Sequence, residues 1–207
     1  MSSDCVVIVM AKAPVPGFAK TRLIPALGAV GAAALALRLL DHSVAQALAA
    51  QLGPVDLCCA PEHTHQGFAA QAAQAAHADI GLSSQVEGDL GARMSHAFDR
   101  WLPRGYRVLM IGTDAPAVDA ALLRQAAHSL TETDAVFVPA LDGGYALVGL
   151  RRAAPQLFAE MVWSTASVMA VTRARLLASG LQHVELPAVA DIDEPADLVH
   201  LPAGWLT

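Results

Sequence analysis

The sequence predicts an α/β protein in which helices cover both faces of one mixed, mainly parallel β-sheet. Short β-branched runs alternate along the chain with Ala- and Leu-rich runs of helical length. Strands and helices that alternate in this way form βαβ units and a mostly parallel sheet. The length of 207 residues suits one domain. Because no linker or internal repeat interrupts the pattern, we expect a single domain over residues 1–207.

The expected strands are short and strongly apolar. Residues 5–10 (CVVIVM) are continuously apolar and β-branched, as in a strand that is buried on both faces. The turn signal Asp142-Gly143-Gly144 separates two later runs and adds an antiparallel hairpin to the sheet. We expect strands at residues 5–10, 55–60, 80–86, 107–111, 135–139, 145–150 and 184–186.

The expected helices lie between and after these strands. Residues 29–51 are rich in good helix formers, and Gly53-Pro54 ends the run. Residues 11–28, which precede this helix, are rich in Pro and Gly and predict a loop. We expect further helices at residues 69–77, 90–101, 119–130, 155–161, 166–179 and 194–200.

The composition excludes several classes of protein. Hydrophobic residues make up 55% of the chain and charged residues 15%, which excludes a disordered chain. The net charge of −6 and the pI of about 5.7 argue against a nucleic-acid partner. Cys5, Cys58 and Cys59 do not form a disulfide framework. Residues 1–4 lack the basic residues of a signal peptide, and the apolar stretch 29–37 is shorter than a membrane helix. We therefore expect a cytoplasmic protein without a membrane span.

A cationic loop follows the first expected strand. It contains Lys12, Lys20 and Arg22, and the chain has no other lysine. Compact ammonium charges and free backbone N–H groups between a strand and a helix suit a phosphate group. The loop is not a P-loop, since Pro14 and Ala19 stand where that motif needs glycine in this register. A polar surface loop without a ligand is the alternative interpretation.

Acidic residues follow two other expected strands. Asp114 comes directly after the strand at 107–111, and Asp191 and Asp193 come after the last strand. Ligands bind beyond the carboxyl ends of the strands in such sheets, so we expect the three carboxylates to converge. Two like charges 4 Å apart repel by about 4 kcal/mol at an effective dielectric near 20. A cation must offset that repulsion, and oxygen ligands suit Mg²⁺ or Mn²⁺. Helix capping is the alternative role for Asp114 and Asp193.

The first loop also carries a resemblance to a known family. Residues 10–27 (MAKAPVPGFAKTRLIPAL) resemble the signature of a glycosyltransferase-A-like group of nucleotide-diphospho-sugar transferases, also called selenodomain-associated transferase 1. Residues 19–23 (AKTRL) are similar to 2-phospholactate guanylyltransferases and, more remotely, to molybdenum-cofactor guanylyltransferases. The resemblance runs through five blocks over nearly the whole chain. It implies a three-layer α/β/α sandwich of the glycosyltransferase-A type.

The resemblance also implies roles for particular residues. In the block around Gln85 it implies that Gln85 and Gly88 contact the base, and Asp89 either caps the next helix or takes part in function. It implies that Asp114, Asp191 and Asp193 hold the metal ion. The candidate catalytic residues are Lys20, Arg22 and Asp114. The candidate nucleotide-binding residues are Ala11, Lys12, Gly17, Lys20, Arg22, Gln85, Gly88 and Arg93. The candidate acceptor-binding residues are Gly143, Gly144, Trp163, Ser164 and Thr165, for which a hairpin turn, a helix cap and core packing are the alternatives.

These observations lead to one expected activity and two alternatives. We expect a Mg²⁺- or Mn²⁺-dependent nucleotidyltransferase that moves a nucleotidyl group, guanylyl by resemblance, from an NTP to a small phosphorylated or carboxylated acceptor. A glycosyltransferase with a nucleotide-sugar donor in the same site is the alternative. Glycosyltransferases of this fold usually have Asp-x-Asp after the middle strand, whereas this chain has Asp114-Ala115-Pro116, which favours nucleotidyl transfer. A nucleotide-binding module without turnover is the second alternative.

Overall fold

The computed structural model describes residues 4–75 and 80–206. Its strands form one seven-stranded sheet in the order β3-β2-β1-β4-β6-β5-β7. Neighbouring strands are parallel except where β6 pairs with β4 and with β5. The sheet is therefore mixed and mainly parallel, as expected. The strands are β1 (Cys5–Lys12), β2 (Val55–Ala60), β3 (Ile80–Ser84), β4 (Arg107–Ile111), β5 (Ala135–Pro139), β6 (Tyr145–Leu150) and β7 (His183–Glu185).

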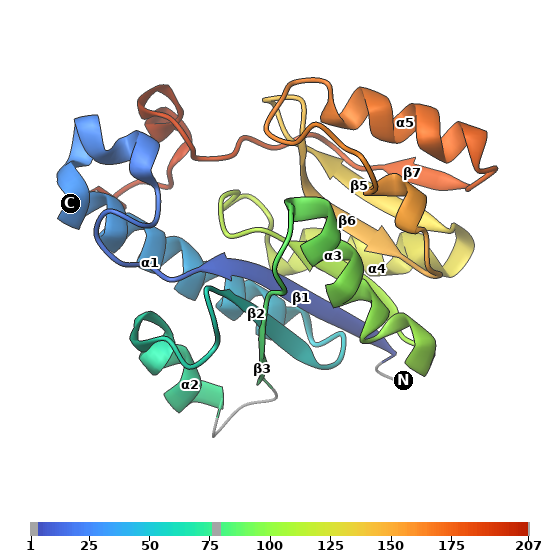
Figure 1. Cartoon of the computed structure of the whole chain (residues 1–207), viewed down its shortest axis with the longest axis horizontal. Coiled ribbons are helices and arrows are strands. Elements are labelled where there is room, and N and C mark those ends of the chain that lie inside the picture. Colours follow the sequence, from blue (N-terminus) through green and yellow to red (C-terminus); the bar gives the residue numbers. More distant parts are fainter. Residues whose placement is uncertain (1–3, 76–79, 207) are drawn as a thin grey trace.

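Helices cover both faces of this sheet (Figure 1). One face packs against α1, α2 and α4, and the other packs against α3 and α5. The α-helices in the described part of the chain are α1 (Ile24–Ala50), α2 (Ala69–Ala75), α3 (Leu90–Asp99), α4 (Ala120–Glu132) and α5 (Val168–Ala178). Short 3₁₀ helices lie at Thr21–Leu23, Gln66–Phe68, Leu102–Arg104, Pro155–Leu157 and Pro195–His200. The arrangement is the expected α/β/α sandwich.

The core explains why β1 is apolar without interruption. Val7 and Val9 belong to the cluster on the α1 side, whereas Val6 and Ile8 belong to the cluster on the α3 side. Successive side chains of a strand point to opposite faces. Since both faces of this sheet are covered, every position of the strand favours an apolar residue.

Several helix boundaries differ from those predicted. α1 begins at Ile24 rather than at residue 29, with a proline in its first turn, and Gly28 (φ 70°) interrupts it with a kink. The first turn of a helix tolerates proline, and glycine tolerates a positive φ. The Pro and Gly residues that suggested a loop therefore lie within the start of this helix. The predicted helix at 155–161 is only the 3₁₀ turn Pro155–Leu157, and the one at 194–200 is also 3₁₀. The predicted extension of α2 to residue 77 lies outside the described residues.

By length and composition, the stretch Thr21–Ala50 could span a membrane, and 33% of its most apolar window is buried. Core helices of globular proteins also meet that criterion. Here α1 packs against β1, β2 and α4, and it buries residues such as Leu39, Leu40 and Val44. We therefore interpret it as a core helix of the sandwich.

Candidate active site

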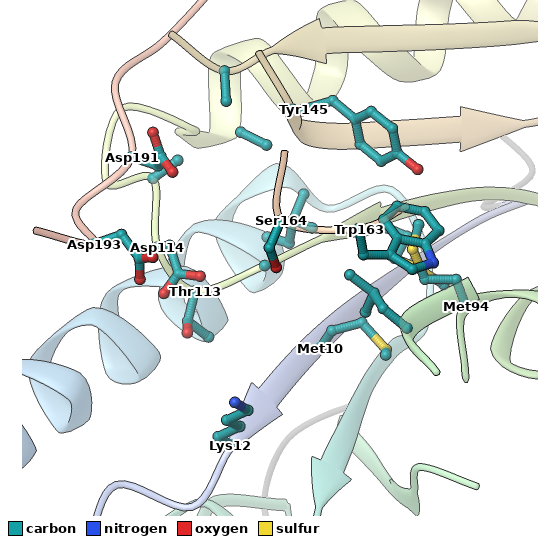
Figure 2. Close-up of a pocket in the computed structure, with 18 of the residues that line it drawn as sticks. Met10, Lys12, Met94, Thr113, Asp114, Tyr145, Trp163, Ser164, Asp191 and Asp193 are labelled. Atoms are coloured by element: carbon teal, nitrogen blue, oxygen red, sulfur yellow. The ribbon is translucent and has the colours of Figure 1, made fainter. Parts of the chain in front are cut away.

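The sheet carries a cleft of about 630 Å³ beyond the carboxyl ends of β1 and β4. Residues from parts of the chain that are far apart in the sequence line it, including the first loop, the segment after β4, and residues 191 and 193. Thirteen of the predicted site residues lie in its lining: Ala11, Lys12, Lys20, Gln85, Gly88, Arg93, Asp114, Gly144, Trp163, Ser164, Thr165, Asp191 and Asp193. Figure 2 shows Asp114, Asp191 and Asp193 at one end of this cleft, with Tyr145, Trp163 and Met94 at the other.

Backbone contacts explain how the two acidic segments meet. The N–H of Ile192 donates to the carbonyl oxygen of Asp114 at 2.8 Å. The Ile192 side chain is fully buried in a small cluster with Leu23 and Leu39. Because Ile192 points into this cluster, its neighbours Asp191 and Asp193 both face the cleft. The residue between the two aspartates is thus the anchor that fixes them.

Lys20 lies within the carboxylate end of the cleft. Its ammonium contacts Asp114 directly, lies 3.6 Å from a carboxylate oxygen of Asp193, and donates to the carbonyl oxygen of Ile192 at 2.5 Å. Its side chain is only 7% exposed, whereas those of Asp114 and Asp193 are half exposed. The backbone of Lys20 has a left-handed conformation (φ 50°) that non-glycine residues seldom adopt. Lys20 therefore supplies the cation that two of the three carboxylates share.

Negative charge remains in excess at this end. Burial, followed by repulsion from Asp142, raises the pKa of Asp191, and Asp114 contributes further repulsion. Asp142 was not among the predicted site residues, although the Asp-Gly-Gly sequence marked it. Its carboxylate accepts a hydrogen bond from the N–H of Gly144 at 2.8 Å and lies at the cleft. A repelled carboxylate beside three others is an environment that favours an additional cation.

The carboxylates do not form a complete metal cage by themselves. Within residues 4–75 and 80–206, no three His, Cys, Asp or Glu side chains are grouped closely enough to hold an ion. Mg²⁺ often uses only one or two carboxylates, and substrate phosphates and water fill its other positions. Asp114 and Asp193, which already share one cation, fit that pattern of binding. The three expected ligands thus lie at one end of the cleft, with Asp114 and Asp193 sharing the Lys20 ammonium and Asp191 near them.

Other residues of the first loop lie in different places. Lys12 ends β1, is exposed, and points into the cleft (Figure 2). Arg22 lies outside the lining, where it pairs with Asp193 at 3.0 Å and with Glu194 at 3.7 Å. Gly17 also lies outside the lining, and its positive φ of 79° makes it a turn residue. Lys20 is paired with carboxylates and Arg22 lies outside the lining, so Lys12 is the basic residue of the loop whose ammonium group faces the cleft without an ion pair among the described residues.

The block around Gln85 is held by its own hydrogen bonds. The Gln85 side-chain amide donates to the carbonyl oxygens of Ala11 and Cys58, which joins the carboxyl ends of β1, β2 and β3. Asp89 caps α3 by accepting from the N–H of Ala92 at 2.8 Å, as its capping alternative predicted. Arg93 donates to the carbonyl oxygen of Gly88 at 3.0 Å. These contacts leave the Gln85 amide oxygen, rather than its nitrogen, for a base.

The predicted acceptor residues divide into lining and packing residues. Trp163, Ser164, Thr165 and Gly144 line the cleft. Gly143 does not, and a Cβ built on it would lie 2.3 Å from the carbonyl oxygen of Ala166. Gly143 is therefore needed where the hairpin turn packs under the segment that carries Trp163. The N-cap of α5 is Ser167, so neither Ser164 nor Thr165 has the capping role weighed for it.

Apart from Trp163, the sequence did not single out the residues at the apolar end of the cleft. Met10, Met94, Met110 and Tyr145 line it, together with Thr113 at the carboxylate end. Isolated methionines in strands and helices are indistinguishable from core residues in a sequence, and here they are core residues that reach the cleft edge. Only the positions of Met10 and Met110, each within two residues of the carboxyl end of an expected strand, could have indicated a role at the cleft.

Comparison with known proteins identifies this architecture. The family model described as "Uncharacterized protein conserved in bacteria (DUF2064)" matches residues 43–165. No curated protein matches the chain. The chain is similar to a candidate nucleotide-diphospho-sugar transferase from Desulfovibrio desulfuricans G20, with 30% identity over 96% of this chain and 85% of that chain and a TM-score of 0.85. The expected fold is confirmed, and the expected transferase enzyme is supported at the level of that class.

Two more distant structures share the fold. A nucleotidyl transferase from Methanothermobacter thermautotroptrophicus is 17% identical, with 98% of this chain and 97% of that chain covered and a TM-score of 0.61. The Rv0371C protein of Mycobacterium tuberculosis H37Rv, in a complex with manganese, is 18% identical, with 95% and 96% covered and a TM-score of 0.50. At these identities the likeness extends to the fold alone.

Proposed function

The chain belongs to the bacterial protein family DUF2064, and from this premise we propose that it is a nucleotidyltransferase using an NTP and a small phosphorylated or carboxylated acceptor. One observation carries the proposal: both lysines and four aspartates, from distant parts of the sequence, line one cleft. Cations bind the phosphate groups of a nucleotide, and carboxylates hold the divalent ion that accompanies them. The similar protein from Desulfovibrio desulfuricans G20 is named a nucleotide-diphospho-sugar transferase, a class whose substrates also carry nucleotide phosphates.

A divalent cation, Mg²⁺ or Mn²⁺, is part of the proposal. Asp114 and Asp193 are the side chains that would hold it, because their oxygens already share one positive charge. Asp191 would support them, since burial and then repulsion from nearby carboxylates raise its pKa, and a cation would relieve that repulsion. When bound, such an ion would offset the negative charge of the phosphates. The manganese complex of a protein with this fold is consistent with the assignment.

The lysines then have separate roles. Lys12 is exposed at the end of β1 and would bind the triphosphate as it arrives. Lys20 neutralises Asp114 and Asp193 in the ligand-free chain. With a divalent ion to neutralise those carboxylates, the Lys20 ammonium would be free to stabilise negative charge on the phosphates. An anionic oxygen of the acceptor attacks the α-phosphorus, the bond from that phosphorus to the bridging oxygen breaks, and pyrophosphate leaves. A phosphate or carboxylate oxygen needs no base, so no proton has to move.

Base preference and cellular location stay predictions. We propose that Gln85 and Gly88 lie beside the base, with guanine expected from the resemblance to guanylyltransferases, and that the protein acts in the cytoplasm. The whole chain would act as one domain, since its seven strands join one sheet. A glycosyltransferase with a nucleotide-sugar donor remains the alternative, because the same residues could hold a diphosphate.

A thermal-shift panel tests the nucleotide and the metal together. We expect one NTP to raise the melting temperature only with Mg²⁺, by roughly 5–10 °C at a concentration 100-fold above Kd. Asp114→Asn should abolish this shift, whereas Asp99→Asn, at an exposed site on α3, should preserve it. An equal shift in EDTA would contradict the metal assignment. Release of pyrophosphate from the stabilising NTP supports nucleotidyl transfer, and release of a nucleoside diphosphate from a nucleotide sugar supports the alternative.

A further inference from the structure

The cleft has an apolar end opposite its carboxylates. Met94 and Met110 are 5% and 3% exposed, and with Met10 they form the edge of the core cluster beneath α3. Tyr145 and Trp163 complete this end, with their rings 6.5 Å apart in an edge-to-face arrangement (Figure 2). Methionine side chains adapt their shape to what they contact. The lining suits the hydrocarbon part of a ligand rather than a sugar or a phosphate.

Two polar atoms in this apolar end lack partners. Within the described part of the chain, neither the Tyr145 hydroxyl nor the Trp163 indole nitrogen has a hydrogen bond, although both atoms are buried. Two other buried atoms also lack partners, but Gln71 and Arg100 each use another side-chain nitrogen in a hydrogen bond. Tyr145 and Trp163 have no second polar side-chain atom. A buried donor without a partner costs free energy, and a ligand oxygen that displaced the side-chain atoms covering it would recover that cost.

The segment that carries Trp163 is held in position rather than free. A Cβ on Gly91 would lie 3.2 Å from the Trp163 ring, so the indole packs closely against the start of α3. Glu160 (φ 51°) and Ser164 (φ 59°) flank the tryptophan, and both have left-handed backbone conformations without being glycine. Such conformations persist where the surrounding structure enforces them, often at binding sites. The chain therefore accepts local strain to place this indole over the cleft.

The order of the strands separates this end from the expected nucleotide site. The Gln85 side chain bonds to the ends of β1 and β2, on the side of the sheet toward β3. Met110 and Tyr145 belong to β4 and β6, on the opposite side of β1. A nucleotide placed over the β1–β2 side leaves the apolar end over β4 and β6 for the second substrate.

We propose, resting on the function given above, that the acceptor is amphiphilic: one end is a phosphate or carboxylate, the body is apolar, and the far end carries an oxygen that accepts hydrogen bonds from Tyr145 and Trp163. The anionic end lies toward the cationic and metal-binding residues, where transfer occurs. The hydrocarbon body contacts the methionines. Tyr145 and Trp163 are then specificity-determining residues that distinguish this acceptor from a purely hydrophilic one.

Direct binding to the full chain tests this proposal without any turnover. The probes are 6-hydroxyhexyl phosphate, hexyl phosphate and glycerol 3-phosphate, measured by calorimetry with and without the NTP that stabilises the protein. We expect hexyl phosphate to bind more tightly than glycerol 3-phosphate. We expect the terminal hydroxyl of 6-hydroxyhexyl phosphate to improve binding a further 10-fold, or about 1.4 kcal/mol. Tyr145→Phe should remove that hydroxyl advantage and leave the affinity for hexyl phosphate unchanged.

Stability separates this role from a structural one. Since the Tyr145 hydroxyl has no partner in the free chain, Tyr145→Phe should not lower the melting temperature. Tyr106→Phe is the matched control, because Tyr106 is the only other tyrosine and packs on Trp101 outside the cleft. This control should retain the hydroxyl advantage.

Two binding results would overturn the proposal: a hydroxyl advantage that survives in Tyr145→Phe, or equal affinities for hexyl phosphate and glycerol 3-phosphate. A third result, competition between hexyl phosphate and the NTP, would also overturn it, because it would assign the apolar end to the base. Failure of the proposed reaction would appear separately, as absence of pyrophosphate release by a chain that still discriminates among the probes.

Discussion

Replacing Lys20 with methionine separates its two proposed roles. In the ligand-free chain Lys20 neutralises Asp114 and Asp193 and donates to the carbonyl oxygen of Ile192. Methionine has a similar length and no charge, so the change removes the cation with little loss of volume. We expect Lys20→Met to unfold more easily, to bind Mn²⁺ alone more tightly, and to lose nucleotide-dependent activity.

The magnitude follows from the contacts of Lys20. Opposite charges 3.6 Å apart attract by about 4–5 kcal/mol at an effective dielectric near 20. The half-exposed carboxylates keep much of their hydration, which reduces the net value to about 1 kcal/mol for an exposed pair. The hydrogen bond from the ammonium to Ile192 adds about 1.5 kcal/mol. We therefore expect a loss of about 2–3 kcal/mol, and a melting temperature lower by roughly 4–12 °C.

Metal binding should change in the opposite direction. Without the Lys20 ammonium, the carboxylates lose their neutralising charge, and a divalent ion no longer competes with it. We expect Mn²⁺ alone to bind 5- to 30-fold more tightly, which is about 1–2 kcal/mol, as measured by electron paramagnetic resonance or calorimetry. Added Mn²⁺ should restore part of the lost melting temperature. Activity should fall about 10²- to 10³-fold, as when one stabilising donor is removed from a reaction centre.

Lys12→Met is the matched control, because it removes the other lysine from the same cleft. The exposed Lys12 is in none of the ion pairs found among the described residues. We expect Lys12→Met to weaken NTP binding about 10-fold while its melting temperature and Mn²⁺ affinity stay unchanged. If Lys20→Met bound Mn²⁺ no better than the wild type or Lys12→Met, the Lys20 ammonium would not compete with the metal, and the reasoning would be refuted.

Two further predictions concern stability. Asp134→Asn removes a buried carboxylate bound by Arg152 and should lower the free energy of unfolding by about 2 kcal/mol. The Arg152 hydrogen bond holds the pKa of Asp134 below its ordinary value, so this stabilisation is present above the unfolded pKa and is lost as pH falls through the folded pKa. In urea unfolding, wild type and variant should therefore converge only in acid, and a constant difference would contradict the cause. Gly143→Ala should cost about 3 kcal/mol or more, because its Cβ would meet Ala166. Gly17→Ala should cost only about 1 kcal/mol, since it faces open space at a similar φ; equal melting temperatures would disprove the packing role.

The sequence was most informative where burial leaves little choice of residue. Four strands lie where they were predicted, because a strand covered on both faces must be continuously apolar, as in RVLMI at 107–111. That Asp114, Asp191 and Asp193 lie at one cleft was also predictable, since ligands bind beyond the carboxyl ends of the strands. How they meet was not, because β4 and β7 are not neighbours and the segment after β7 reaches Asp114 through the backbone hydrogen bond of Ile192. The start of α1 was not, because Pro25 and Gly28 are typical of loops and here lie within the first turns of a helix.

The side-chain partners within the cleft could not be predicted, and they account for most of its local energetic costs. Of the four non-glycine residues with positive φ in the described chain, Lys20 and Ser164 line the cleft, and Glu160 precedes Trp163 in the same loop. Two buried donors there lack partners, and burial, followed by repulsion from other carboxylates, raises the pKa of Asp191. Sequence patterns report what stabilises a fold, whereas these features oppose stability and are retained where a ligand would relieve them. Ligand binding should therefore raise the free energy of unfolding of the protein more than any substitution that keeps the charged residues of the cleft.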